Sequence, residues 1–198
     1  MQILFVDGCV RGTASRTRRL AAAFLDALRT RCPQARVDTV DLNILRPAPL
    51  FGDTLAARDA AMGDWQQPCF ALARQFRAAD LVVFAAPFWE GTFPAALHAY
   101  LEHICVTGLT FGYAADGRPE GYCRAGRAVF FSTRGGIYSA GPARADDHAA
   151  AFLGSIMRLL GITQLDTVVA EGLDIAGADV DALMAEAETR ARALAQTF

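Results

Sequence analysis

The stretch Leu81–Glu102 constrains the fold of this chain more than any other. It begins with the apolar run LVVFAA, continues as PFWEGTF and ends as PAALHAYLE. An unbroken apolar run rich in β-branched residues is typical of a strand that is buried on both faces of a sheet. Pro87 ends the run, and Pro94 can open a helix because an amide in the first helical turn needs no partner. The stretch therefore predicts a buried strand, a loop and a helix.

The rest of the chain alternates strands and helices in the same way. Four further strands are predicted over Ile3–Asp7, Arg36–Asp41, Ala128–Thr133 and Leu165–Ala170. Four further helices are predicted from about Ser15, over Asp53–Ala79 with interruptions near Gly63 and Pro68, over Arg144–Leu160 and over Asp179–Thr197. Such alternation indicates a doubly wound parallel sheet. We therefore predict one α/β domain over residues 1–198, with a five-stranded parallel sheet and helices on both faces.

Two connections carry turn signals instead of a helical or strand pattern. Residues 43–51 (NILRPAPLF) contain two prolines and are predicted to be loop. Residues 104–127 contain the turn signals DG and PEG, and residues 110–113 resemble a short extended arm. This second connection is therefore predicted to be a hairpin or a loop.

The charge and hydropathy of the chain exclude several classes of protein. Of its 198 residues, 53% are hydrophobic and 20% are charged, as in an ordinary folded domain. Nineteen basic and 21 acidic residues give a net charge of -2, which leaves no basic field for nucleic acid or an anionic membrane. The amino terminus lacks the features of a secretion signal, and no apolar run is long enough to span a membrane. We therefore expect a cytoplasmic protein with neither a nucleic-acid nor a membrane partner.

The cysteines and histidines do not predict a metal site. The five cysteines are an odd number without a CxxC pair, which favours reduced thiols. His98 and Glu102 stand one helical turn apart and could share a metal. Two ligands without a third make a solvated helix face the better interpretation.

Three of the loops are expected to meet at one edge of the sheet. In the strand order 2-1-3-4-5, the loops after the first, third and fourth strands converge where the order reverses. These loops are GCVRGTASRT, PFWEGTF and TRGG. The first offers hydroxyls, a guanidinium and helix-start amides for a phosphate, the second an aromatic surface, and the third exposed amides. Together they suit a flat aromatic ligand with a phosphorylated tail, such as flavin mononucleotide (FMN).

Two of the three loops also have a plainer interpretation when they are taken alone. Ser15 could be an ordinary helix N-cap, and Phe88 and Trp89 could cap the sheet hydrophobically. The chain has neither a Walker lysine nor a GxGxxG motif, so a P-loop or dinucleotide-type first turn is not predicted. The conjunction of the three loops outweighs these separate interpretations.

The three blocks also give the chain a family resemblance. It resembles the flavodoxin-like NAD(P)H-dependent oxidoreductases, the group of FMN-dependent azoreductases and NAD(P)H quinone reductases. The resemblance rests on the loop with SRT, on APFWEGTFPAALHAYLEHICVTGLTFGY and on STRGG, and it spans nearly the whole chain. It implies a flavodoxin-like fold with the strand order 2-1-3-4-5, and a homodimer that binds one FMN per subunit, with FAD less favoured. NAD(P)H would pass hydride to the flavin, and a quinone, azo compound or similar small-molecule acceptor would then take its place in a ping-pong scheme.

The same resemblance assigns the site residues by position. The phosphate would be held by Ser15, Arg16 and Thr17, and Cys9 in the same loop would also contact the cofactor. The flavin ring would be lined by Pro87, Phe88, Trp89 and Glu90, and its other edge by Thr133, Arg134, Gly135 and Gly136. A substrate pocket near the dimer interface would take Trp89, Phe111 and Tyr113, although ordinary interface packing explains Phe111 and Tyr113 equally well. No side chain is expected to act as a catalytic acid or base, because the flavin carries the chemistry.

Three residues of this set raise questions of their own. Cys9 stands where many members have a serine, and a thiol is the weaker hydrogen-bond donor. Glu90 stands where azoreductases often have asparagine, and an ionised carboxylate cannot donate a hydrogen bond, so we expect it to influence flavin potential or acceptor choice. Arg134 is a candidate for stabilising negative charge on the reduced flavin.

Rival functions remain open at this point. A flavodoxin-type electron carrier would bind FMN and pass single electrons to a protein partner, but such carriers tend to be strongly acidic, unlike this chain with its net charge of -2. A non-catalytic flavin sensor would bind FMN tightly and turn over slowly. An α/β-hydrolase is excluded because the chain has no GxSxG motif.

Overall fold

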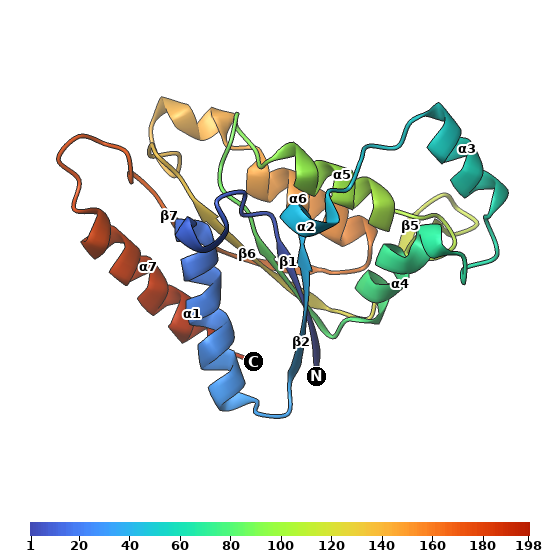
Figure 1. Ribbon diagram of the computed structural model, residues 1–198, viewed down its shortest axis with the longest axis horizontal. Helices are drawn as coiled ribbons and strands as arrows, with labels where there is room; N and C mark the ends of the chain where they lie inside the picture. The colour runs from blue at the N-terminus through green and yellow to red at the C-terminus, as the bar shows by residue number, and fades with distance from the viewer.

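The computed structural model describes residues 1–198, which form a central five-stranded sheet covered by helices on both faces (Figure 1). The strands are β1 (Gln2–Asp7), β2 (Arg36–Asp41), β3 (Leu81–Ala85), β6 (Arg127–Thr133) and β7 (Gln164–Ala170). Their order is β2-β1-β3-β6-β7, and every neighbouring pair is parallel. Counted along the sheet's own strands, this is the predicted order 2-1-3-4-5.

The two faces of the sheet build two separate cores. Alternate strand residues, among them Val6, Val82 and Phe130, pack on the face covered by α4 (Ala71–Ala78), α5 (Ala95–Ile104) and α6 (Ala149–Leu159). Their neighbours Phe5, Val83 and Phe131 pack on the opposite face, under α1 (Arg16–Arg31) and α7 (Val180–Ala195). Successive side chains of a strand point to opposite faces, so β3 is apolar at every position, and β1 and β6 are apolar in their middle residues.

Two predicted boundaries were wrong. Leu42–Leu45 forms the short helix α2, and Arg46, with φ of 48°, ends it. The helix expected from Arg144 begins only at Ala149, after a 3-10 turn over Pro142–Asp146. Asp147 separates the turn from the helix with an extended backbone, and its carboxylate is fixed by an ion pair at 2.8 Å. A tertiary contact of Asp147 sets the start of α6, whereas α2 is capped locally, because the Asp41 side chain accepts a hydrogen bond from the Asn43 amide at 2.8 Å.

The connections outside the sheet follow the turn signals. The interrupted helix expected before β3 is α3 (Gly52–Ala60), a 3-10 turn (Pro68–Phe70) and α4. β4 (Phe111–Tyr113) and β5 (Pro119–Gly121) form an antiparallel hairpin. In Figure 1, α3 projects at one end of the molecule, and none of its residues is buried. None of the helices combines the length and the apolar character that a membrane span requires.

Candidate functional site

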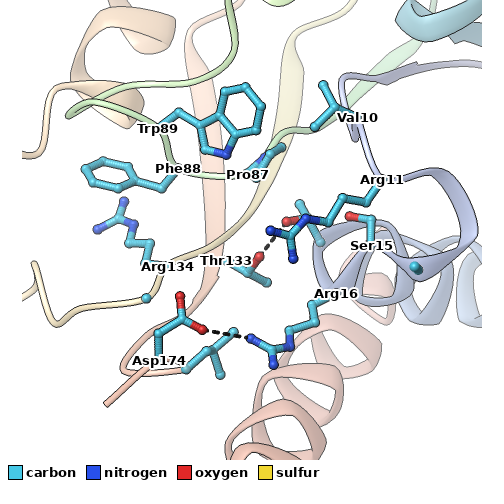
Figure 2. A pocket seen from close by; sticks show the side chains of 14 residues that line it. Val10, Arg11, Ser15, Arg16, Pro87, Phe88, Trp89, Thr133, Arg134 and Asp174 are labelled. Carbon is cyan, nitrogen blue, oxygen red and sulfur yellow. Dashed lines mark hydrogen bonds and ion pairs between the residues drawn. The ribbon is translucent and has the colours of Figure 1, made fainter. Parts of the chain in front are cut away.

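A cavity of about 270 Å³ lies at the carboxyl ends of β1, β3 and β6 (Figure 2). This is the point where the strand order reverses, the usual ligand position in an open α/β sheet. The loops after these three strands line the cavity together with the loop after β7. The lining residues are Val10, Arg11, Ala14, Ser15, Arg16, Thr17, Pro87, Phe88, Trp89, Thr133, Arg134, Gly135, Leu173 and Asp174.

The start of α1 forms one end of the cavity. Ser15 is the N-cap residue, and its hydroxyl accepts a hydrogen bond from the Arg18 amide at 3.2 Å. The amides of Arg16 and Thr17 have no acceptor within the helix, because the first amides of an α-helix point beyond its end. No acidic residue lies in this first turn. The helix dipole and the free amides therefore favour an anion here.

A hydrogen bond joins this helix start to the end of β6. The hydroxyl oxygens of Thr17 and Thr133 lie 2.6 Å apart, and Thr17 is almost completely buried. The same Thr133 accepts a hydrogen bond from the Phe88 amide through its carbonyl oxygen, at 3.1 Å. Thr133 thus holds the first and second predicted loops against the third.

The aromatic wall of the cavity depends on a tight turn. Trp89 and Thr92 exchange two backbone hydrogen bonds, of 3.1 and 2.8 Å, across Glu90 and Gly91. Both central residues have positive φ, 50° and 80°, as a type I′ turn requires. A side chain at Gly91 would also lie 2.9 Å from the Asp146 carbonyl oxygen. The turn leaves Trp89 44% exposed at the rim of the cavity.

Two carboxylates from the loop after β7 approach the arginines of the site. Asp174 pairs with Arg16 at 3.2 Å, and Glu171 pairs with Arg134 at 2.9 Å. Burial of Glu171 opposes its ionisation, but hydrogen bonds from Ser139, the Tyr138 amide and Arg134 outweigh it and lower the Glu171 pKa. The loop reaches the cavity because amides 172, 173 and 174 donate to the carbonyl oxygens of residues 136, 134 and 135.

Nine of the twelve residues expected to contact the cofactor line this cavity, and Cys9, Glu90 and Gly136 do not. The Cys9 side chain is fully buried in the core, where its thiol donates to the Ala85 carbonyl oxygen at 3.6 Å. Burial raises the Cys9 pKa, so the thiol stays protonated. The Cys9 side chain therefore faces the core and does not line the cavity. Glu90 lies exposed at the tip of its turn.

Phe111 and Tyr113 do not line the cavity. They belong to the β4–β5 hairpin, and their rings meet edge to face with centroids 5.8 Å apart. Phe111 is buried against the core, whereas Tyr113 is 61% exposed. Of the three residues expected around a substrate, only Trp89 lines the cavity.

Sequence reasoning missed five lining residues. Val10, Arg11 and Ala14 lie within GCVRGTASRT, the loop predicted to hold a phosphate, but they were not predicted individually. Leu173 and Asp174 gave no signal, because they follow the edge strand β7, whose loop is not at the point where the strand order reverses.

The cavity meets the requirements of FMN on structural grounds. It joins free helix-start amides at one end to Pro87, Phe88 and Trp89 on its side. An anion fits the first feature and a flat apolar ring fits the second. No group of three or more histidine, cysteine, aspartate or glutamate residues is placed to hold a metal ion.

Comparison with known proteins agrees with this geometry. The FMN-dependent NADH:quinone oxidoreductase 2 of Clostridium acetobutylicum is 36% identical over 185 residues, which cover 93% of this chain and 92% of that protein. The FMN-dependent NADH:quinone oxidoreductase of Rhizobium meliloti is 35% identical over 200 residues, covering 95% and 94%. The crystal structure of an azoreductase from Bacillus anthracis matches with a TM-score of 0.89 and 27% identity, covering both chains completely.

The family comparison covers the same span. A family model described as having a flavodoxin-like fold matches residues 1–195, which is nearly the whole chain. The strand order and the position of the cavity are those expected for such a fold. The chain therefore belongs to the family with the flavodoxin-like fold.

Proposed function

We propose that this protein is an FMN-dependent oxidoreductase that passes reducing equivalents from NADH to a small-molecule quinone or azo acceptor. The observation that carries the proposal is the cavity itself, which joins an anion-binding helix start to an aromatic wall at the reversal of the strand order. The names of the relatives, FMN-dependent NADH:quinone oxidoreductases and an azoreductase, support the donor and the acceptor classes.

The residues of the cavity divide the task of holding FMN. Ser15, the amides of the first turn of α1 and the Arg16 guanidinium would hold the phosphate. Pro87, Phe88 and Trp89 would line the ring and exclude water from one side. Bound FMN supplies the hydride chemistry, which no side chain of the cavity can supply. No protein acid or base is needed, and none is assigned.

Donor and acceptor are proposed to use the same open side of the cavity in turn. Trp89 lies at this rim and is 44% exposed, so its indole is accessible to a second flat molecule. A shared position requires the oxidised nicotinamide to leave before the acceptor binds, which is the ping-pong scheme.

We further propose that the protein is a homodimer. The segment that contains α2 and the start of α3 exposes Ile44 (81%) and Phe51 (62%), which are costly to leave in water. A groove of about 430 Å³ lies beside it, between α2 and α5. This surface would form the dimer interface, with the exposed ring of Tyr113 contributing to a substrate pocket. Analytical ultracentrifugation is expected to give twice the chain mass of 21.2 kDa, and Ile44→Glu is expected to give monomer. A monomeric wild type would overturn this proposal.

The five cysteines, all free thiols, support a reducing compartment, and we propose the cytoplasm. The decisive test of the activity is an anaerobic absorbance titration of the FMN-loaded protein with NADH, and separately with NADPH. Bleaching of the flavin band by NADH, reversed by benzoquinone, is the expected result. Failure to bind FMN would refute the proposed site. Binding without bleaching by either nicotinamide would favour an electron carrier or a sensor.

A further inference from the structure

Arg134 is almost completely enclosed, although it lines the cavity. Only 3% of its side chain is exposed, and its Nη1 atom lies 2.8 Å from Asp147 and 2.9 Å from Glu171. One guanidinium between two carboxylates leaves the cluster with a net charge of -1. Arg134 is therefore not a free cation that waits for a ligand.

The two carboxylates come from different parts of the chain. Asp147 precedes α6, and Glu171 follows β7, while Arg134 itself follows β6. Glu171 also accepts hydrogen bonds from the amides of Tyr138 and Ser139, at 3.1 and 3.2 Å. One arginine thus ties the ends of β6 and β7 to the segment that leads into α6.

The guanidinium also fixes the aromatic wall. Its central carbon lies 4.8 Å from the centroid of the Phe88 ring and 5.9 Å from that of Tyr138. The Phe88 and Tyr138 rings lie 4.5 Å apart. In Figure 2, the Arg134 side chain points toward Phe88 and away from Arg16. Phe88 contacts both a cation and a second ring, and both contacts are attractive for an aromatic side chain.

We propose that Arg134, Asp147 and Glu171 form a clamp that positions Phe88 for the flavin ring. Arg134 is then a positioning residue and supplies no charge to the phosphate or to the reduced ring. This inference rests on the proposed function, because it assigns Phe88 to the flavin. The competing possibility is direct contact, since the Arg134 Nε–H has no hydrogen-bond partner within the protein.

Glu171 distinguishes the two possibilities because it does not line the cavity. Glu171→Ala removes one of the two carboxylates of the clamp and leaves Arg134 paired with Asp147. The probe is riboflavin, which has the ring but no phosphate, and its affinity is measured by fluorescence quenching alongside that of FMN. We expect the riboflavin Kd to rise at least about fivefold, because the wall that contacts the ring loses its position. The control is Arg144→Gln, an exposed position in the 3-10 turn before Asp147, for which both Kd values should stay within about twofold.

Hydrogen exchange of the free protein shows whether the clamp has been broken. The amides of Tyr138 and Ser139 should exchange faster in Glu171→Ala than in the wild type. Faster exchange with an unchanged riboflavin Kd would overturn the proposal, as would a loss of FMN affinity alone. Should Glu171→Ala fail to fold, Glu171→Gln carries the same test.

The failure of the clamp and the failure of the proposed function give different results. If the wild-type protein binds neither flavin, the proposed function fails. Unchanged exchange at Tyr138 and Ser139 in Glu171→Ala would overturn the clamp whether or not flavin binds.

Discussion

Two arginines flank the same cavity, and each pairs with an acid from the loop after β7, but their surroundings are opposite. The Arg16–Asp174 pair spans 3.2 Å, with 45% and 74% of the side chains exposed. The Arg134–Glu171 pair spans 2.9 Å, with 3% and 16% exposed. Exposed ion pairs contribute little to stability, whereas breaking a buried pair leaves a charge stranded in the interior. Arg16 can therefore exchange Asp174 for a bound ligand, whereas Arg134 stays paired with Glu171.

The difference follows from where each arginine stands in the fold. Arg16 is the first residue of α1 and points across the mouth of the cavity toward Asp174 (Figure 2). Arg134 follows β6 and is covered by the rings of Phe88 and Tyr138. Solvent screens the first pair and is excluded from the second.

The largest expected effect comes from removing each guanidinium in turn. Arg134→Met should lower the free energy of unfolding by about 3–5 kcal/mol, because two partly buried carboxylates lose their cation. Arg16→Met should lower it by less than about 1 kcal/mol. Urea denaturation of both variants measures the difference. Equal losses in the two variants would show that burial does not separate these pairs.

The second-largest effect is expected at Ser15, which lies beside Arg16 at the start of α1. Ser15→Ala should weaken FMN binding by about tenfold, because a hydrogen bond to a charged group contributes about 1.5 kcal/mol. Riboflavin affinity should change by less than about twofold, since riboflavin has no phosphate. Ser15→Asp keeps a capping oxygen and should preserve the helix, but its charge should weaken FMN binding further. Equal losses for FMN and riboflavin would place the phosphate elsewhere.

A smaller effect of opposite sign is expected at Asp174. Its carboxylate occupies Arg16 and repels a bound phosphate, so Asp174→Asn should tighten FMN binding by about three- to tenfold at low ionic strength. The gain should shrink in 0.5 M salt, because the charges are exposed and screened. Riboflavin titrations in parallel provide the control. Weaker FMN binding in this variant would mean that Asp174 itself helps to hold the cofactor.

The smallest effect concerns the acid stability of the buried side. The Glu171 pKa is lowered from its usual value of 4.5, so the unfolded chain binds a proton more readily at this position. This contribution to stability is present above pH 4.5 and is lost as the pH falls through the lowered pKa. Between pH 5 and 3, the free energy of unfolding should therefore fall less steeply in Glu171→Gln than in the wild type. Denaturation curves with identical slopes would contradict this.

Much of the fold could be predicted from the sequence because strands and helix caps depend on residues that are close together in the chain. Apolar runs such as Leu81–Ala85 become central strands, and Ser15 caps a helix because its hydroxyl meets an amide three residues later. The start of α6 could not be predicted from the sequence. Asp147 interrupts the expected helix, and the arginine that fixes its carboxylate lies 13 positions earlier in the chain, at residue 134.

The sequence by itself determined the five-stranded parallel sheet, the three ligand-facing loops and the residue types that suit a phosphorylated aromatic ligand. Only the tertiary structure decided which ion pairs are exposed and which are buried. It buried the Cys9 thiol and brought Glu171 and Asp174 to arginines 37 and 158 positions away. The reason is physical: periodicity and capping arise within a few residues, whereas an ion pair depends on the path of a distant loop and on how much water its surroundings admit.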